Sequence, residues 1–178
     1  TDDRKIHEEE ELTEGVWVQM VNPSEGEGEE YARKLDVDIT DLLAALDEEE
    51  SSRIELEDGY TLILVDIPTT EIRMDKEAYT TIPLGIILTK DAIITVCTED
   101  TPVLQSFVLG RVKEFSTKKR LRFVYQILFR IATLYQSALR IIDKKRTEIE
   151  ERIDGDTEDI DLIRSEERRV GKECHFEC

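Results

Sequence analysis

The feature that most constrains the fold is a pair of apolar runs, rich in β-branched residues, joined by a short turn. The runs cover residues 83–88 and 92–96, and Lys90-Asp91 lies between them. Each run is apolar at consecutive positions, so each predicted strand must be covered on both of its faces. We therefore expect two neighbouring strands in the middle of a sheet, with other elements packed on both sides.

Shorter segments predict a further strand and two helices. Residues 16–21 are apolar except for Gln19 and are mostly β-prone, which indicates a strand. Asn22 is a good helix N-cap and Pro23 suits a first helical position, so we expect a helix from there to Leu35. A second short helix is expected over residues 39–46, where the apolar residues recur at helical spacing behind Asp38 or Thr40 as the cap.

Two further turn signals complete the predicted body. Asp58-Gly59 lies between alternating apolar residues and predicts a hairpin, whose second strand we expect to end within residues 65–68. The polar residues 69–76 would then form a connection to the central pair of strands. Thr101-Pro102 predicts the start of another helix, which turns four apolar side chains inward: Val103, Leu104, Phe107 and Val108.

The longest periodic segment is a predicted helix over residues 118–153. No Gly or Pro interrupts it, and at 1.5 Å per residue it would be ~50 Å long and project beyond the body. We expect Asp154-Gly155-Asp156 to end it. Its apolar positions follow alternating steps of three and four residues: Leu121, Val124, Leu128, Ile131, Tyr135, Ala138, Ile142 and Ile149.

These elements predict a mixed α/β fold of the αβα type, with a central mixed sheet flanked by helices and followed by a long C-terminal, stalk-like helix. The chain would divide into an acidic mobile leader (1–14), an α/β body (15–117), the long helix (118–153) and a last segment (154–178). The last segment is interpreted as a linker and a tail foreign to the fold, derived from an expression vector or a mistranslation.

Charge and composition exclude several classes of function. Asp and Glu number 42 against 24 Lys and Arg, and the net charge of -18 repels phosphate backbones and anionic membranes, so no nucleic-acid partner is expected. No signal peptide opens the sequence, and no apolar run reaches the ~18 residues of a membrane span. The three cysteines form neither a disulfide framework nor a zinc-binding spacing, which favours a reducing compartment.

Catalytic chemistry is not expected either. The histidines, His7 and His175, lie in the acidic leader and in the tail, away from any nucleophile that they could activate. Cys97 ends a buried-looking strand and Trp17 lies in the first strand, so we interpret both as packing residues rather than as a reactive thiol and a binding platform. The sequence therefore predicts a protein that is not an enzyme.

Divalent cation binding is the ligand chemistry that the composition permits. Mg²⁺ keeps several of its waters and needs only one or two carboxylates. Asp41, Asp47 and Glu48 are the candidate ligands, since helical spacing from Asp41 through Ala44 brings one of the other two to the same face. The alternative, which the general acidity favours, is a solvated helix end without a ligand.

Several segments, read in order, resemble one family of membrane transporters. They are Trp17-Val18-Gln19-Met20-Val21-Asn22-Pro23, Leu42-Leu43-Ala44-Ala45-Leu46-Asp47, Ser52-Arg53-Ile54-Glu55, Tyr60-Thr61-Leu62-Ile63-Leu64-Val65 and Pro83-Leu84-Gly85-Ile86-Ile87-Leu88-Thr89-Lys90. In order and spacing they resemble the cytoplasmic N-terminal domain of CorA-type magnesium transporters. The resemblance covers residues 15–153. It implies an αβα body that feeds a stalk helix toward the pore, in a transporter that assembles as a homopentamer.

The resemblance also has departures. The family's Gly-Met-Asn signature and its two transmembrane helices do not occur in this sequence, so we expect a soluble fragment of a longer chain. Ala44 stands where the family often has an acidic residue of an inter-subunit magnesium-sensing site. Arg130 and Thr133 stand at positions of the stalk that are acidic in familiar members.

The predicted function is therefore regulation: residues 15–117 would be the regulatory, ion-sensing domain of a transporter of magnesium or other divalent metal ions, at the cytoplasmic face of the cell membrane. Its expected partners are further copies of the same chain, in a homopentamer of the full-length protein, and the missing transmembrane helices. Bound Mg²⁺, or another divalent cation, would be weakly held and regulatory, and no organic cofactor is expected. The alternative is a cytosolic protein-interaction module whose long helix pairs with a partner as a coiled coil.

Overall fold

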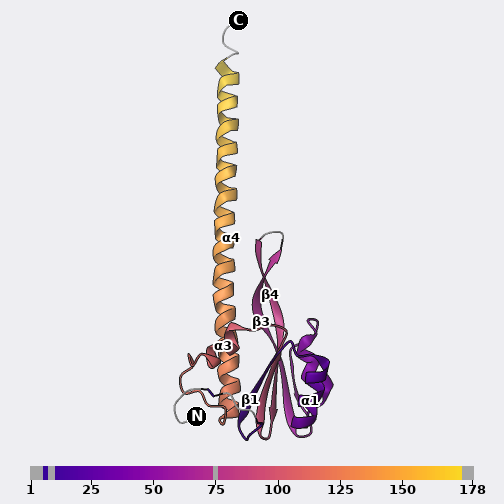
Figure 1. Ribbon diagram of the computed structural model, residues 1–178. Coiled ribbons are helices and arrows are strands. Elements are labelled where there is room, and N and C mark those ends of the chain that lie inside the picture. Colours follow the sequence, from indigo (N-terminus) through magenta and orange to yellow (C-terminus); the bar gives the residue numbers. More distant parts are fainter. Residues whose placement is uncertain (1–5, 8–10, 74–75, 174–178) are drawn as a thin grey trace. The chain divides into compact units, whose positions relative to one another are not determined.

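The fold was analysed in a computed structural model, which describes residues 6–7, 11–73 and 76–173 of the chain. Side chains are described for residues 6–7, 11–72 and 78–153. The chain forms two compact units, residues 1–135 and residues 136–178, and each is described by itself. The first unit contains the sheet and the helices packed on it (Figure 1).

A five-stranded mixed sheet forms the centre of the first unit, in the order β1-β5-β4-β3-β2. The edge strand β1 pairs with β5 in parallel, and the other three pairs are antiparallel. The central position predicted for the two apolar runs is confirmed, since they lie in β4 and β5. The strands are β1 (Val16–Val21), β2 (Arg53–Leu56), β3 (Tyr60–Arg73), β4 (Lys76–Thr89) and β5 (Ala92–Cys97).

The hairpin of β3 and β4 is longer than the sequence predicted. Strand pairing continues as far as Arg73 with Lys76, so the expected connection over residues 69–76 is wrong. Pro68 and Pro83 made an earlier end plausible because proline cannot donate to a strand ladder. Both prolines lie in the part of the hairpin where β3 and β4 pair only with each other, beyond the residues that pair with β2 or β5. The missing backbone N–H groups therefore disrupt neither the β2–β3 ladder nor the β4–β5 ladder.

Helices cover both faces of the sheet, which confirms the predicted αβα arrangement (Figure 1). One face packs against α1 (Glu25–Leu35), α2 (Ile39–Leu43) and the 3-10 turn η1 (Ala44–Leu46). Gly85 of β4 allows the closest approach there, since a Cβ on it would lie 3.1 Å from the Cβ of Ala45. The other face packs against α3 (Pro102–Val108) and the first turns of α4 (Arg120–Glu173).

Local capping explains where the short helices begin. The N-cap of α1 is Ser24, which forms a capping box with Glu27, so the prediction of Asn22 as the cap is wrong. Asn22 instead has a φ of 45°, which belongs to the turn between β1 and α1. Asp38 caps α2 and Thr101 caps α3, as expected. Val108 of α3 is exposed rather than buried.

Helix α4 differs from its prediction in length and in register. It begins at Arg120 and continues to Glu173, so the predicted break at Asp154-Gly155-Asp156 is wrong. A single glycine costs a helix only ~1 kcal/mol relative to alanine, which a long helix tolerates. Its buried side chains in the first unit are Phe123, Val124, Ile127 and Ile131.

The apolar residues predicted along α4 in alternating steps of three and four would form a seam that repeats every seven residues. This prediction is only partly correct. Leu121 and Leu128 belong to that seam but are exposed, whereas Phe123 and Ile127 do not belong to it and are buried. A straight helix has 3.6 residues per turn, and its buried face drifts relative to a seam that repeats every 3.5. The first turns of α4 pack as an ordinary helix on a sheet rather than as a coiled coil.

Candidate functional site

Asp41 is the predicted ligand that the fold holds most firmly. It lies on α2, and its Oδ2 accepts a hydrogen bond of 2.5 Å from the hydroxyl of Tyr60, at the start of β3. The same hydroxyl accepts a bond of 3.4 Å from the backbone N–H of Asp38. Burial, followed by the bond to Asp41, raises the pKa of Tyr60 to about 12, so the tyrosine stays a neutral donor to the carboxylate.

Asp47 and Glu48 lie after the helical turn and not within it. The backbone of Asp47 is extended, with φ −92° and ψ 114°, and its Oδ1 accepts a bond of 3.0 Å from the N–H of Glu49. Both residues are exposed. The helical face that was expected to carry Asp41 together with Asp47 or Glu48 therefore ends at Leu46.

The three candidates do not form a ready-made metal cage. Within the part of the chain that the structure describes, no group of three or more His, Cys, Asp or Glu side chains is arranged to hold a metal ion. Sequence reasoning missed Tyr60 as the partner of Asp41, because a contact between residues 19 positions apart leaves no local pattern.

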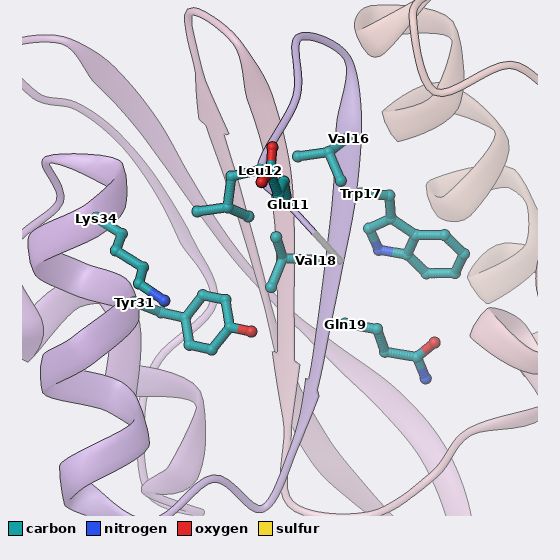
Figure 2. A pocket seen from close by; sticks show the side chains of 8 residues that line it. All are labelled: Glu11, Leu12, Val16, Trp17, Val18, Gln19, Tyr31 and Lys34. Carbon is teal, nitrogen blue, oxygen red and sulfur yellow. The ribbon is translucent and has the colours of Figure 1, made fainter. Parts of the chain in front are cut away.

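A hollow of about 470 Å³ lies at the sheet edge, along β1 (Figure 2). Trp17 and Gln19 lie on one side of the strand, and Tyr31 and Lys34 of α1 lie on the other. The hollow thus follows the edge of the sheet, and residues on both sides of β1 line it. Its charged side chains, Glu11 and Lys34, have opposite signs and suggest no particular ligand.

Trp17 and Cys97 are packing residues, as predicted. The indole forms edge-on contacts with Phe107, Phe115 and Phe123 at 5.0–6.3 Å between ring centroids, and its Nε1 donates to Thr95 Oγ1 at 2.9 Å. Cys97 is fully buried, and this burial raises the pKa of its thiol to about 11, with Asp100 and Glu99 adding to the effect. Both side chains thus pack in the core, and Trp17 also lines the hollow along β1.

The remaining sequence candidates are His7 and three residues close to the C-terminus. His7 lies in the leader and is exposed. His175, Cys174 and Cys178 fall outside the described residues. Among the residues that the structure describes, no helix combines the length and the apolar character needed to cross a membrane.

Comparison with known proteins places the fold in a family. The model of the CorA-like Mg²⁺ transporter protein family matches residues 13–165. A curated relative is the cobalt/magnesium transport protein CorA of Methanocaldococcus jannaschii, which is 24% identical over 147 residues, or 78% of this chain and 43% of the relative.

Solved structures agree with that assignment. The soluble domain of CorA from Methanocaldococcus jannaschii matches with a TM-score of 0.64 and 23% identity, over 76% of this chain and 54% of that one. The complete CorA magnesium transporter from the same organism matches with a TM-score of 0.59 and 22% identity, over 76% and 43%. The full-length CmaX protein matches at 0.53 and 10%, over 72% and 39%.

The chain thus spans about half or less of the length of these relatives. The family model nevertheless covers most of the chain, and the sheet, its helices and the long α4 reproduce the fold of a CorA soluble domain. This chain therefore belongs to the CorA-like Mg²⁺ transporter family and has the fold of its soluble N-terminal domain.

Proposed function

We propose that this chain is the regulatory, cation-sensing domain of a transporter of magnesium or other divalent metal ions, at the cytoplasmic face of the cell membrane. The observation that carries this proposal is the match of residues 13–165 to a family of Mg²⁺ transporters. Regulation is the contribution to transport that we assign to this folded body. Helix α4 would connect the body to transmembrane helices of the same chain.

Weak binding of hydrated cations is the proposed chemistry. The net charge of -18 raises the local concentration of cations at the surface. Asp41 is oriented by Tyr60, while Asp47 and Glu48 reach into solvent, so these three carboxylates would hold a cation through its waters. Weak binding of this kind would suit a sensor of an abundant ion.

The proposed mechanism is linkage between cation binding and assembly. Copies that each carry a charge of -18 repel one another, and cations that bridge acidic surfaces of neighbouring copies would favour a closed assembly. The full-length protein would be a homopentamer. Self-association of the described part of the chain would be weak, because these residues include no membrane-spanning helix that could hold the copies at a high effective concentration.

The alternative, a cytosolic module that uses its long helix as a coiled coil, is not favoured. The family assignment accounts for both the body and the helix, and the first turns of α4 pack on the sheet with an ordinary helical register. A coiled-coil module would have no reason to share the remaining architecture of a transporter domain.

Thermal melting with and without Mg²⁺ tests the proposal. A cation that binds only the folded state stabilises it by RT ln(1 + [L]/Kd), which is about 1 kcal/mol at ~20 mM Mg²⁺ and a Kd of ~5 mM. For a chain of this size, the midpoint Tm should rise by about 2–4 °C. The control is NaCl at the same ionic strength. An equal Tm in both salts would contradict cation sensing and leave the family assignment unaffected.

A further inference from the structure

The start of α4 is held against the turn between β4 and β5 by one arginine. The guanidinium of Arg120 donates from Nη1 to the backbone carbonyl groups of Thr89 and Lys90. These acceptors are neutral, and among the described ion pairs none involves Arg120. Arginine is always charged in proteins and has donors besides Nη1, so Arg120 presents a positive charge in a fixed position.

Two hollows meet at this arginine. The first, the basic hollow, has a volume of about 530 Å³ and lies between residues 13–15, the β4–β5 turn and the start of α4. The second, the adjoining hollow, has about 440 Å³ and lies between the β2–β3 turn and the start of α4. Lys90 and Arg120 line both. Each volume falls within the range of about 300–1,000 Å³ that is usual for small-molecule sites.

The basic hollow is positively charged although the chain is strongly acidic. Lys90, Lys118 and Arg120 line it, against the two carboxylates of Glu14 and Asp91. Both lysines are exposed and take part in none of the described ion pairs. At 0.15 M salt the Debye length is about 8 Å, so most of the net charge of -18 is screened from an ion in the hollow. A small anion is therefore attracted there.

A glycine holds one of the lysines against the wall of the basic hollow. Gly15 has a φ of 80°, and its N–H donates to the carbonyl group of Asp91 at 2.6 Å. A Cβ on Gly15 would lie 2.9 Å from Cγ of Lys118, so the stem of this lysine packs directly on the glycine backbone. Packing of the stem restricts the positions that the ammonium group can take, which lowers the entropic cost of holding a ligand.

The adjoining hollow adds apolar contacts beside these charges. It is lined by Leu121 of α4, which is 79% exposed, and by Leu88 of β4, which packs against the core. Its acidic lining residue is Glu57, which leaves Lys90 and Arg120 in excess. The two hollows together therefore suit a ligand that combines an anionic group with an apolar or planar part.

We propose that these two hollows bind a phosphorylated small molecule of the size of a nucleotide, with its phosphates in the basic hollow and its ring in the adjoining hollow. Lys and Arg are the side chains that most often bind phosphate oxygens. A ligand that contacts Lys90 and Arg120 together ties the start of α4 to the sheet. This inference goes beyond the proposed cation sensing, because its ligand is an anion and Asp41, Asp47 and Glu48 do not line either hollow.

A phospholipid headgroup has the same phosphate chemistry, but the charge distribution favours a free ligand. A membrane surface presents many anionic charges at once, and it would meet the acidic remainder of a chain with a net charge of -18. A small phosphate ester enters the basic hollow and meets the local charge of that hollow. The experiment compares both sources.

Calorimetric titration of the whole chain with ATP, in EDTA and 0.15 M NaCl, tests the proposal. ATP should bind saturably and roughly fivefold more tightly than pyrophosphate, which reaches only the basic hollow, or adenosine, which has no charge. Lys90→Gln with Lys118→Gln should weaken ATP binding roughly fivefold or more. The matched control is Lys113→Gln with Lys119→Gln, which removes two exposed lysines outside both hollows and should change the affinity less than about twofold.

Two single variants test the two parts of the site, and thermal melting verifies that each variant is folded. Glu14→Gln removes a carboxylate from the basic hollow, so it should strengthen the binding of ATP and of pyrophosphate by about twofold. Leu121→Ser should weaken ATP binding about threefold and leave pyrophosphate binding unchanged. Its control is Leu139→Ser, an exposed leucine further along α4, which should leave both unchanged.

Three results would overturn the proposal. The first is no saturable binding of ATP up to about 5 mM, and the second is an equal loss of affinity in the two double-lysine variants, since that would reflect overall charge alone. The third is binding to vesicles of phosphatidylglycerol that the Lys90 and Lys118 substitutions abolish, in a chain that does not bind ATP. Since EDTA removes divalent cations, this site and the proposed cation sensing can fail separately.

Discussion

At the scale of single residues, burial determines how this domain responds to reagents and to pH. Cys97 lies within the core on β5, and its thiol has a pKa of about 11. Tyr60 has a pKa of about 12 and donates to Asp41. Both groups are neutral in the folded protein over the physiological range, so neither is a nucleophile or a base for this domain.

Cys97 should be unreactive until the domain opens. In a chain with Cys174→Ser and Cys178→Ser, Cys97 is the only thiol. At pH 8, we expect a thiol reagent to modify Cys97 at least a hundredfold more slowly in buffer than in urea. The reason is that the thiolate is the reacting species and burial disfavours it. Absorbance of the released chromophore measures the rate. Equal rates in buffer and in urea would contradict the buried position.

Tyr60 should make the domain lose stability in alkali. In the folded state its pKa is raised from 10.0 to about 12, so the unfolded chain releases this proton first, and the free energy of unfolding falls from pH 10 to 12. Cys97 acts in the same direction from pH 9 to 11. Tyr60→Phe should cost about 1 kcal/mol at pH 8, from the lost hydrogen bond.

Urea unfolding at pH 8 and pH 11 measures both effects. The Tyr60→Phe chain should lose less stability between these two pH values than the natural chain does. Tyr125→Phe, which alters an exposed tyrosine on α4, is the control and should leave the difference unchanged. The same alkaline loss in all three chains would contradict the role of Tyr60.

At the scale of elements, close contacts between helices determine what each residue contributes to stability, and a local sequence pattern does not show them. Helix α1 contains two glycines in different surroundings. A Cβ on Gly26 would meet nothing within 4 Å, whereas a Cβ on Gly28 would lie 2.9 Å from Cδ2 of Leu43 and 3.1 Å from Cδ1 of Ile39. Gly28 is therefore the point where α1 packs on α2, whereas Gly26 has no packing role and is only a poor helix former.

The two glycines predict different effects of the same substitution. Gly26→Ala should stabilise the protein by about 0.5 kcal/mol, because alanine is the better helix former. Gly28→Ala gains the same propensity but must displace Leu43 and Ile39, which costs about 1 kcal/mol or more. Urea unfolding of both variants measures the difference. Gly28→Ala as stable as Gly26→Ala would show that α1 and α2 pack loosely.

Which elements could be predicted depends on whether their signals are local. Asp58-Gly59, Asp38 and Thr101-Pro102 act within a few residues, and their turn and helix starts were found from the sequence. The long β3–β4 hairpin was not, because its pairing with a partner strand outweighs the polar composition of residues 69–76. The continuation of α4 through Gly155 was not predicted, because a single glycine weakens a long helix without ending it.

At the scale of the whole molecule, the order and spacing of the apolar segments were enough to identify the family. They were not enough to identify the residues that bind a ligand. The central strands and the strand of Trp17 depend on burial, which sequence patterns report well. The environment of Asp41 depends on Tyr60 and on the fold that joins them, which no local pattern encodes.

The carboxylates at the end of the α2 layer are the proposed sensors of divalent cations. The most direct test compares the rise in Tm caused by ~20 mM Mg²⁺, at matched ionic strength, in two variants of equal charge. One carries Asp41→Asn, Asp47→Asn and Glu48→Gln, and the control carries Glu25→Gln, Glu29→Gln and Asp36→Asn. The natural chain and the control should gain about 2–4 °C, as expected for millimolar binding, and the first variant less than half of that. The same gain in all three chains would contradict the claim.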